Sequence, residues 1–111
     1  MEWNIYFYNE QVKEQIATLP KCLKARCLAL LDRMRSDGAN LGSPHTESIG
    51  DGLFELRVKA QEGIARAFFC TLVNKKIVIL HSFIKKTQKT PKKELDLAKL
   101  RLKEVKKDDK R

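Results

Sequence analysis

The sequence predicts a small α+β domain in which amphipathic helices pack on an antiparallel sheet. Apolar and charged residues alternate in three consecutive segments between Gly52 and Lys85, as in strands with one buried face. Two segments with helical spacing of apolar residues precede these strands, and another follows Pro91. With a short strand at the start, the expected order is β-α-α-β-β-β-α in a single domain over residues 1–111.

The first half of the chain is expected to form one strand and two helices. Residues 3–8 (WNIYFY) are rich in residues that favour strands. Asn9 can cap the helix that follows, and Pro20 ends that helix and can open the next. Gly38 is placed to end the second helix. Residues 39–51 contain Gly, Pro, Ser and Asn without a period and are interpreted as a loop.

The three strands of the second half imply a register. A loop of residues 60–63 joins the first strand to the second, and Asn74 and Lys75 are expected to form a two-residue turn into the third. Three directly opposed pairs follow: Arg57 with Arg66, Phe68 with His81, and Arg66 with Phe83. A shift of one residue would move every side chain to the other face.

This register divides the sheet into an apolar face and a charged face. The face expected to form the core under the helix pair contains Phe54, Leu56, Val58, Ala65, Ala67, Phe69, Val78, Leu80 and Ile84. The opposite face contains Glu55, Arg57, Lys59, Arg66, Phe68, His81, Phe83 and Lys85. The last helix is expected to begin at Pro91 with Thr90 as its N-cap, and residues 106–111 (KKDDKR) are expected to fray.

The charge of the chain favours an anionic partner. The formal net charge is +9, and residues 85–111 contain twelve Lys or Arg against five Asp or Glu. Such a surface suits nucleic acid or an acidic protein, although a merely solvated charged face is the alternative. The three cysteines (Cys22, Cys27 and Cys70) form no CxxC motif. We therefore expect buried thiols, no zinc site, no cofactor, no membrane segment and a cytoplasmic location.

The charged face carries groups suited to cleaving an RNA phosphodiester without a metal. Opposed arginines destabilise a sheet unless an anion lies between them, and a phosphate fits Arg57 and Arg66. Phe68 and Phe83 could stack on bases, and His81 could transfer a proton near neutral pH. Carboxylates do not cluster, which disfavours a two-metal nuclease.

Structural roles for the same residues are the alternatives. Phe68 and Phe83 could belong to a core under the last helix, and His81 could be a hydrogen-bonded structural histidine. Arg57 could form a plain surface ion pair. His45 lies in the expected loop, where a lone histidine is usually solvated.

Three strings in the second half resemble a known family. GLFELRVK (residues 52–59), RAFF (residues 66–69) and ILHSFIKKTQKTP (residues 79–91) are similar to the HigB-like, phage-associated branch of the RelE/ParE toxin superfamily. The resemblance implies a RelE-like fold and the toxin of a type II toxin–antitoxin module. It also implies ribosome-dependent, metal-independent cleavage of mRNA.

The resemblance agrees with the site obtained from the register. Its basic sheet residues match Arg57, Lys59, Arg66, Lys85 and Lys86. We therefore predict one set of catalytic residues: Arg57, Arg66, His81 and Lys85. We predict a second set that binds RNA: Lys59, Phe68, Phe83, Lys86 and Lys89.

One feature departs from the family. Several RelE toxins use a tyrosine on or before the last helix as the base, whereas Tyr6 and Tyr8 lie in the first strand here. The candidate for that role is His81, with Lys85 or Lys86 as the alternative. The register also predicts that Arg66→Ala removes toxicity with little loss of stability.

Two other functions fit the same fold. One is a ParE-like, non-enzymatic inhibitor of DNA gyrase, and the other is a module that only binds nucleic acid or its antitoxin. The expected partners are a HigA-like antitoxin with a helix-turn-helix, the ribosome and mRNA. The toxin–antitoxin complex is expected to bind operator DNA through the antitoxin.

Overall fold

The protein was analysed as a computed structural model that describes residues 2–86 and 90–108. The elements follow the order β-α-α-β-β-β-β-α. Their bounds are β1 (Asn4–Phe7), α1 (Glu10–Ala17), α2 (Lys21–Asp37), β2 (Thr46–Gly50), β3 (Leu53–Ala60), β4 (Gly63–Leu72), β5 (Lys76–Lys85) and α3 (Lys92–Asp108). The predicted α+β class is confirmed, and one strand is added to the predicted order.

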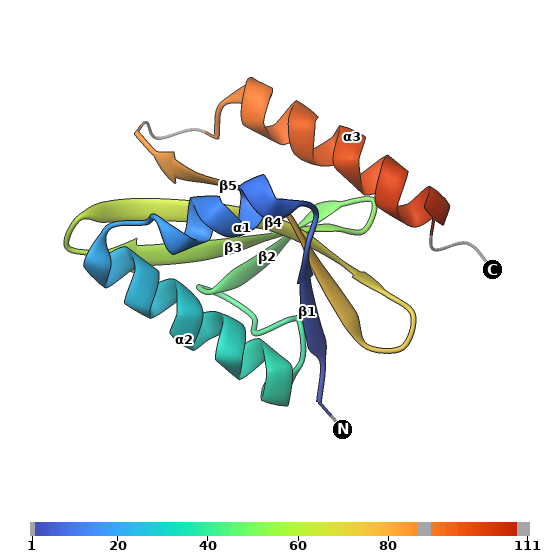
Figure 1. Ribbon diagram of the computed structural model, residues 1–111, viewed down its shortest axis with the longest axis horizontal. Helices are drawn as coiled ribbons and strands as arrows, with labels where there is room; N and C mark the ends of the chain where they lie inside the picture. Colours follow the sequence, from blue (N-terminus) through green and yellow to red (C-terminus); the bar gives the residue numbers. More distant parts are fainter. Residues whose placement is uncertain (1, 87–89, 109–111) are drawn as a thin grey trace.

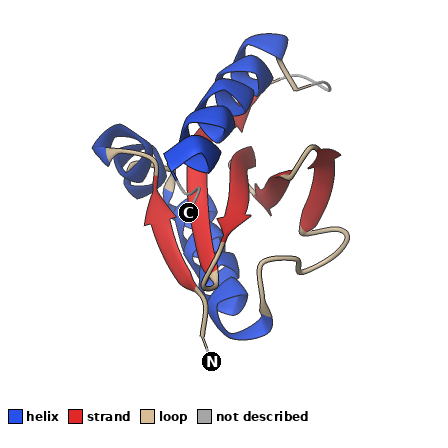
Figure 2. Cartoon of the chain, turned by 90° about the vertical axis from the view of Figure 1, so that its right-hand side faces the viewer, coloured by secondary structure: helices blue, strands red, loops and turns tan. Residues whose placement is uncertain are grey.

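A single five-stranded sheet forms the middle layer, with strand order β1-β5-β4-β3-β2. The strands pair antiparallel except at one edge, where β1 runs parallel to β5. The sheet is twisted, and α3 lies on one side of it while α2 lies on the other (Figures 1 and 2). None of the described helices is long and apolar enough to cross a membrane.

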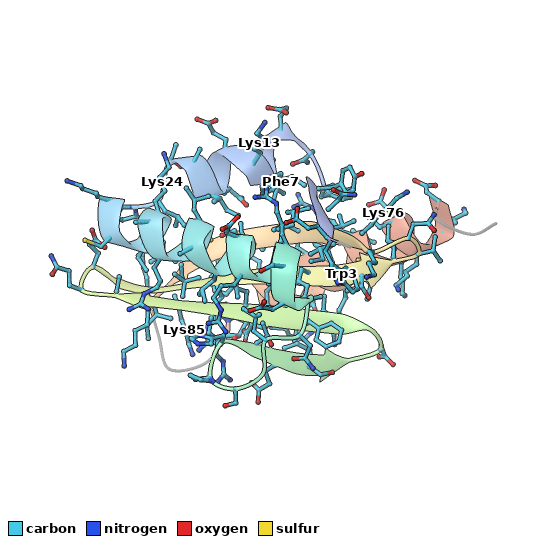
Figure 3. All side chains as sticks on the ribbon, turned by 90° about the horizontal axis from the view of Figure 1, so that it is seen from below. Trp3, Phe7, Lys13, Lys24, Lys76 and Lys85 are labelled. Atoms are coloured by element: carbon cyan, nitrogen blue, oxygen red, sulfur yellow. The ribbon has the colours of Figure 1, made fainter. Side chains whose placement is uncertain are left out.

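The larger core lies between the sheet and the two N-terminal helices. Val12 and Ile16 of α1 and Leu23 and Met34 of α2 are fully or almost fully buried against it. Asn9 caps α1 as predicted, because its side chain accepts a hydrogen bond from the Val12 amide (2.9 Å). Figure 3 views the molecule from the side of α2, with Lys13 labelled on α1 and Lys24 on α2.

The N-terminus of α2 is capped by a residue from a distant hairpin. Pro20 stands at the N-cap position and offers no side-chain hydrogen bond. Glu62, in the β3–β4 turn, accepts hydrogen bonds from the amides of Cys22 (2.8 Å) and Leu23 (2.9 Å) instead. A carboxylate at a helix N-terminus is favourable both as an acceptor and for its charge. This contact fastens the hairpin to the helix layer.

A smaller core lies under α3. Ala98 and Leu102 of the helix pack with Phe68, Leu80 and other buried residues of the sheet. The face that the register predicted to be charged is therefore covered where α3 crosses it. The helix continues to Asp108, so residues 106–108 are helical rather than frayed, while residues 109–111 lie outside the described part. Thr90, the expected N-cap, instead directs its hydroxyl toward Glu55 (3.4 Å).

The strand β2 lies inside the segment that was predicted to be a loop. Thr46–Gly50 (TESIG) pairs with β3, and only Thr46 among its residues is buried. The sequence contains two glycines around this strand and little apolar alternation, so the pattern carries no strand signal. Pairing with the exposed edge of β3 overrides local preference here.

Two irregularities of the β4–β5 hairpin compensate for one another. The turn contains three residues, because Leu72 pairs with Lys76, and not the predicted two. A β-bulge at Leu80 then adds one residue to β5, which restores the predicted pairs Phe68–His81 and Arg66–Phe83. The predicted register was therefore correct for residues 81–85 of β5 and wrong by one residue for residues 76–79.

The bulge reverses which side chains of β5 face the helix pair. Ile77 and Ile79 point toward α1 and α2, whereas Val78 and Leu80 lie in the core under α3. The prediction that Val78 and Leu80 share a face with Phe69 was wrong for this reason. Arg101 of α3 donates a hydrogen bond to the Leu80 carbonyl (2.8 Å), which satisfies a backbone group at the irregularity.

Candidate nucleic-acid interface

The predicted site residues lie in three rows across β3, β4 and β5, as the register required. The rows are Glu55–Phe68–His81, Arg57–Arg66–Phe83 and Lys59–Ile64–Lys85. Burial falls from the first row to the third, because the first lies under α3 and the third lies at the uncovered end of the sheet. We call Arg57, Lys59, Arg66 and Lys85 the basic end of the sheet.

The row under α3 is part of the core. Phe68 is completely buried, so its ring presents no surface on which a base could stack. His81 is 6% exposed and stacks on Phe83, and its Nε2 lies 2.5 Å from a carboxylate oxygen of Glu94 in α3. These positions favour the structural alternatives for Phe68 and His81. They leave the proton-transfer role without its expected residue.

The two opposed arginines share a buried carboxylate. Glu55 is 2% exposed, and one of its oxygens lies 2.7 Å from Arg66 Nη1 and 3.5 Å from Arg57 Nε. Arg57 also pairs with Glu47 of β2. The anion that the arginine pair needed is therefore supplied within the protein, and it fixes both guanidinium groups in place. Two carboxylates and two guanidiniums leave this cluster formally neutral.

This arrangement corrects the expectation for Arg66→Ala. The Arg66 side chain is 11% exposed, and it is the nearer of the two cations to buried Glu55. Removing it leaves a buried carboxylate with the more distant Arg57 as its cationic partner, which costs stability. The register places Arg66 on the face that was predicted, but the claim that its removal is harmless to stability does not hold.

The remaining predicted residues lie around the uncovered end. Lys59 and Lys86 are exposed, and Lys85 and Phe83 are partly buried. Lys89, predicted to bind RNA, lies outside the described residues. Both tyrosines lie far along the sheet in the region of β1. Tyr8 donates a hydrogen bond to Glu104 (2.6 Å), and that bond is the main cause that raises the pKa of the phenol.

A cavity of about 360 Å³ lies next to the start of β2. Here the residues of β3 after Leu56 have no partner in β2. We call this cavity the edge cavity. Its lining residues are Arg26, Leu30, Pro44, His45, Arg57, Val58, Lys59, Ile64 and Arg66. Every charged side chain in that lining is a cation, drawn from α2, β3 and β4. This concentration of positive charge at a hollow suits a phosphate group.

Sequence reasoning missed Arg26 and favoured plain solvation for His45. Arg26 lies on α2, where nothing in the helical spacing singled it out. His45 reaches the cavity because the turn before β2 folds toward β3, and neither β2 nor that turn was predicted. The only signal in the sequence was a histidine in a segment rich in Gly and Pro.

The cysteines and the carboxylates offer no further centre in the described part of the chain. Burial raises the pKa of the Cys27 thiol to about 11, and Cys70 is also buried. Among residues 2–86 and 90–108, no three His, Cys, Asp or Glu side chains come together in a way that could hold a metal ion.

Both the sequence and the fold are similar to those of known proteins. Residues 14–103 match the family model described as "Phage derived protein Gp49-like (DUF891)". The crystal structure of an archaeal RelE–RelB complex from Pyrococcus horikoshii OT3 contains a chain of similar fold, with a TM-score of 0.57 and 20% sequence identity. The likeness covers 76% of this chain and 96% of that one. No curated protein matches the sequence significantly.

The family match covers most of the chain, and the structural match shows the fold. Both agree with the resemblance to the RelE/ParE superfamily in the strings around Arg57, Arg66 and Lys85. The protein therefore belongs to the family of phage-derived Gp49-like proteins and has a RelE-type fold.

Proposed function

We propose that this protein is the toxin of a type II toxin–antitoxin module and that it cleaves mRNA on the ribosome without a metal. The observation that carries the proposal is the basic end of the sheet, where Arg57 and Arg66 stand opposite one another beside the row of Lys59 and Lys85. This cluster borders the edge cavity, whose charged lining is entirely cationic. The RelE-type fold supports the same assignment.

The arginines serve as a preorganised clamp for the phosphate. Arg57 is 38% exposed in its side chain and reaches solvent, while Arg66 is held from beneath by Glu55. Because Glu55 fixes the guanidiniums before RNA arrives, little reorganisation is needed when charge develops on the phosphorane. Lys59 and Lys85 add positive charge beyond the neutral cluster and favour binding of the RNA backbone.

The partners follow from the same surface. An antitoxin with an acidic segment would cover the basic end of the sheet and compete with RNA for it. We propose a HigA-like partner with a helix-turn-helix, through which the complex would bind operator DNA. The ribosome and mRNA are the proposed targets, and the cytoplasm is the proposed location.

The decisive experiment is to express the chain alone and map mRNA 5′ ends in a translating lysate. New ends within translated codons are expected with the wild type. Arg57→Ala should reduce them strongly, since Arg57 is the more exposed arginine and its loss leaves Glu55 paired with Arg66. Lys99→Ala on the exposed surface of α3 is the matched control and should cut normally.

Two outcomes would contradict the proposal in different ways. Double-strand breaks with translation intact would assign the protein to gyrase inhibition. Harmless expression without a partner, together with specific binding of nucleic acid, would assign it a binding role only.

A further inference from the structure

We infer that His45 is the side chain that accepts the proton during RNA cleavage, and that the edge cavity holds the phosphate being attacked. The inference rests on the proposed function. The chain has two histidines, and His81 is buried against Glu94 of α3. His45 is half-buried and lines the edge cavity together with Arg57 and Arg66. Two of the basic residues predicted for catalysis, Arg57 and Arg66, therefore line a cavity with the other histidine.

The turn that carries His45 is held in place by hydrogen bonds. The amides of His45 and Thr46 both donate to the Gly42 carbonyl (2.9 and 3.0 Å). The hydroxyl of Thr46 is buried, accepts from the Gly42 amide (2.9 Å) and donates to Asn40 (2.9 Å). A solvated surface loop needs no such network, whereas a side chain that must meet a reacting atom does.

A second contact ties His45 to the arginine pair. The His45 carbonyl, immediately before the first residue of β2, accepts a hydrogen bond from the Arg57 amide (2.8 Å). The backbone of His45 is therefore fixed relative to the strand that carries Arg57. Because amides alternate in direction along a strand, the Lys59 amide points toward the same uncovered edge. It provides a neutral donor to an anion at that edge.

The charges around His45 favour an anionic ligand. Arg26 faces the cavity from α2, Arg57 and Lys59 from β3, and Arg66 from β4. The carboxylates of Glu47 and Glu55 pair with the two arginines and are not among the residues that line the cavity. The cavity volume lies near the lower end for small-molecule sites, so it suits one nucleotide unit. A phosphate there would lie among cations with an imidazole beside it.

The chemistry balances with the groups of the cavity. A nitrogen of neutral His45 takes the proton from a ribose 2′-hydroxyl, and the freed oxygen forms a bond to phosphorus. The bond from phosphorus to the 5′-oxygen breaks, and the Lys59 ammonium gives that oxygen a proton. The products are a 2′,3′-cyclic phosphate and a 5′-hydroxyl, without any other reactant. Arg57 and Arg66 stabilise the charge on the phosphorane.

The first test compares His45→Gln with His81→Gln in ribosome-dependent cleavage between pH 5.5 and 8. His45→Gln should cut at least about 10²-fold more slowly, and should lose the rise of rate with pH that a histidine base gives. Its melting temperature should stay at the wild-type value. His81→Gln should lower the melting temperature and keep that rise. Wild-type cleavage by His45→Gln, or loss of the pH dependence only in His81→Gln, would overturn the inference.

The second test does not depend on activity. Inorganic phosphate is added to the wild-type protein while the imidazole resonances are followed by NMR. The His45 ring signals should move in a saturable manner while the His81 signals stay in place, and Arg26→Ala should weaken the response. Cleavage by the wild type without any phosphate response at His45 would refute the inference and leave the proposed function intact. A response at His45 without cleavage of mRNA would refute the proposed function and the proton-transfer role.

Discussion

Glu55 is the residue that allows two arginines to stand opposite one another in a sheet. Its carboxylate is buried, accepts from Arg66 at 2.7 Å and from Arg57 at 3.5 Å, and receives the Thr90 hydroxyl at its other oxygen. A bound phosphate cannot have been required for the fold, because the protein contains its own anion. The phosphate site must instead use the outward-facing nitrogens of the arginines and the cations around them.

Arg66→Ala is expected to destabilise the protein by roughly 2 kcal/mol, because buried Glu55 loses its nearer partner. Denaturant unfolding of the variant measures the loss. The double variant Glu55→Gln/Arg66→Ala should recover part of it, since an amide is less costly than a charge in the same place. Equal stability of Arg66→Ala and the wild type would show that Glu55 is solvated or held by other groups.

At the scale of elements, α3 and the bulge in β5 depend on one another. The bulge places Val78 and Leu80 on the side of α3, where they join Phe68 in the smaller core. Arg101 of α3 donates to the Leu80 carbonyl and lies over the Tyr8 ring, with 4.6 Å from its guanidinium carbon to the ring centre. One side chain therefore links the helix to β5 and to the residue that follows β1.

Arg101→Ala should destabilise the protein by about 2 kcal/mol, since it removes a charged hydrogen bond to a backbone carbonyl and a cation–π contact. Amide exchange should increase most in β5 near Leu80 and along α3. Lys99→Ala is the control, because Lys99 is exposed on the same helix. A uniform increase across the whole chain would indicate global unfolding and not local release of α3.

Glu62→Gln should lower stability at neutral pH and make Cys22 react faster with alkylating reagents. The amide of Cys22 is the main cause that lowers the pKa of Glu62 from its ordinary value of 4.5, and the bond to Glu62 raises the pKa of the exposed Cys22 thiol. Because the folded pKa is depressed, the stabilisation exists above pH 4.5 and is lost as the pH falls through the folded value.

Thermal melting from pH 2.5 to 7 checks the first part of this prediction. The difference between Glu62→Gln and the wild type should shrink as the pH falls below 4.5. A constant difference across that range would mean that the charge of Glu62 is unimportant to the cap. The thiol reaction of Cys22 at pH 7.5 checks the second part, with the buried Cys27 as the internal unreactive reference.

Local patterns predicted the helices, four of the five strands and the pairs that define the site. Asn9, Gly38 and the alternation in β3 are local signals. The opposed pair Arg57–Arg66 follows from the predicted loop of residues 60–63, in which the structure pairs Ala60 with Gly63. The strand β2, the bulge at Leu80 and the cover over His81 were not predicted. Each depends on contacts between distant segments, which a periodic pattern does not contain.

The edge cavity could not be predicted from the sequence for the same reason. Arg26, His45 and Lys59 come from a helix, a turn and a strand. They line one cavity because β2 starts only at Thr46. Composition predicted that a basic surface exists, but not that one cavity collects positive charge from α2, β3 and β4. The sequence predicted the three rows correctly. It could not predict which row stays uncovered, because that depends on where α3 packs on the sheet.

For the whole molecule, a net charge of +9 should make binding of single-stranded RNA strongly dependent on salt. If the four basic residues at the end of the sheet each contact a phosphate, affinity should fall on the order of 50-fold between 50 and 200 mM salt. Fluorescence anisotropy with a short RNA measures the slope. Lys85→Ala should lower both the affinity and the slope, whereas Lys99→Ala should leave the slope almost unchanged.

The parallel pairing of β1 with β5 has a consequence for how the protein is made. Asn4 pairs with Lys76 and Phe7 with Ile79, so the first strand synthesised has no partner until most of the chain exists. The larger core also needs Ile77 and Ile79 of β5 to close against the N-terminal helices. During synthesis the nascent chain therefore lacks its complete sheet, because β1 must wait for β5. Under the proposed function, the chain would cut no RNA until β5 has been made and has paired with β1.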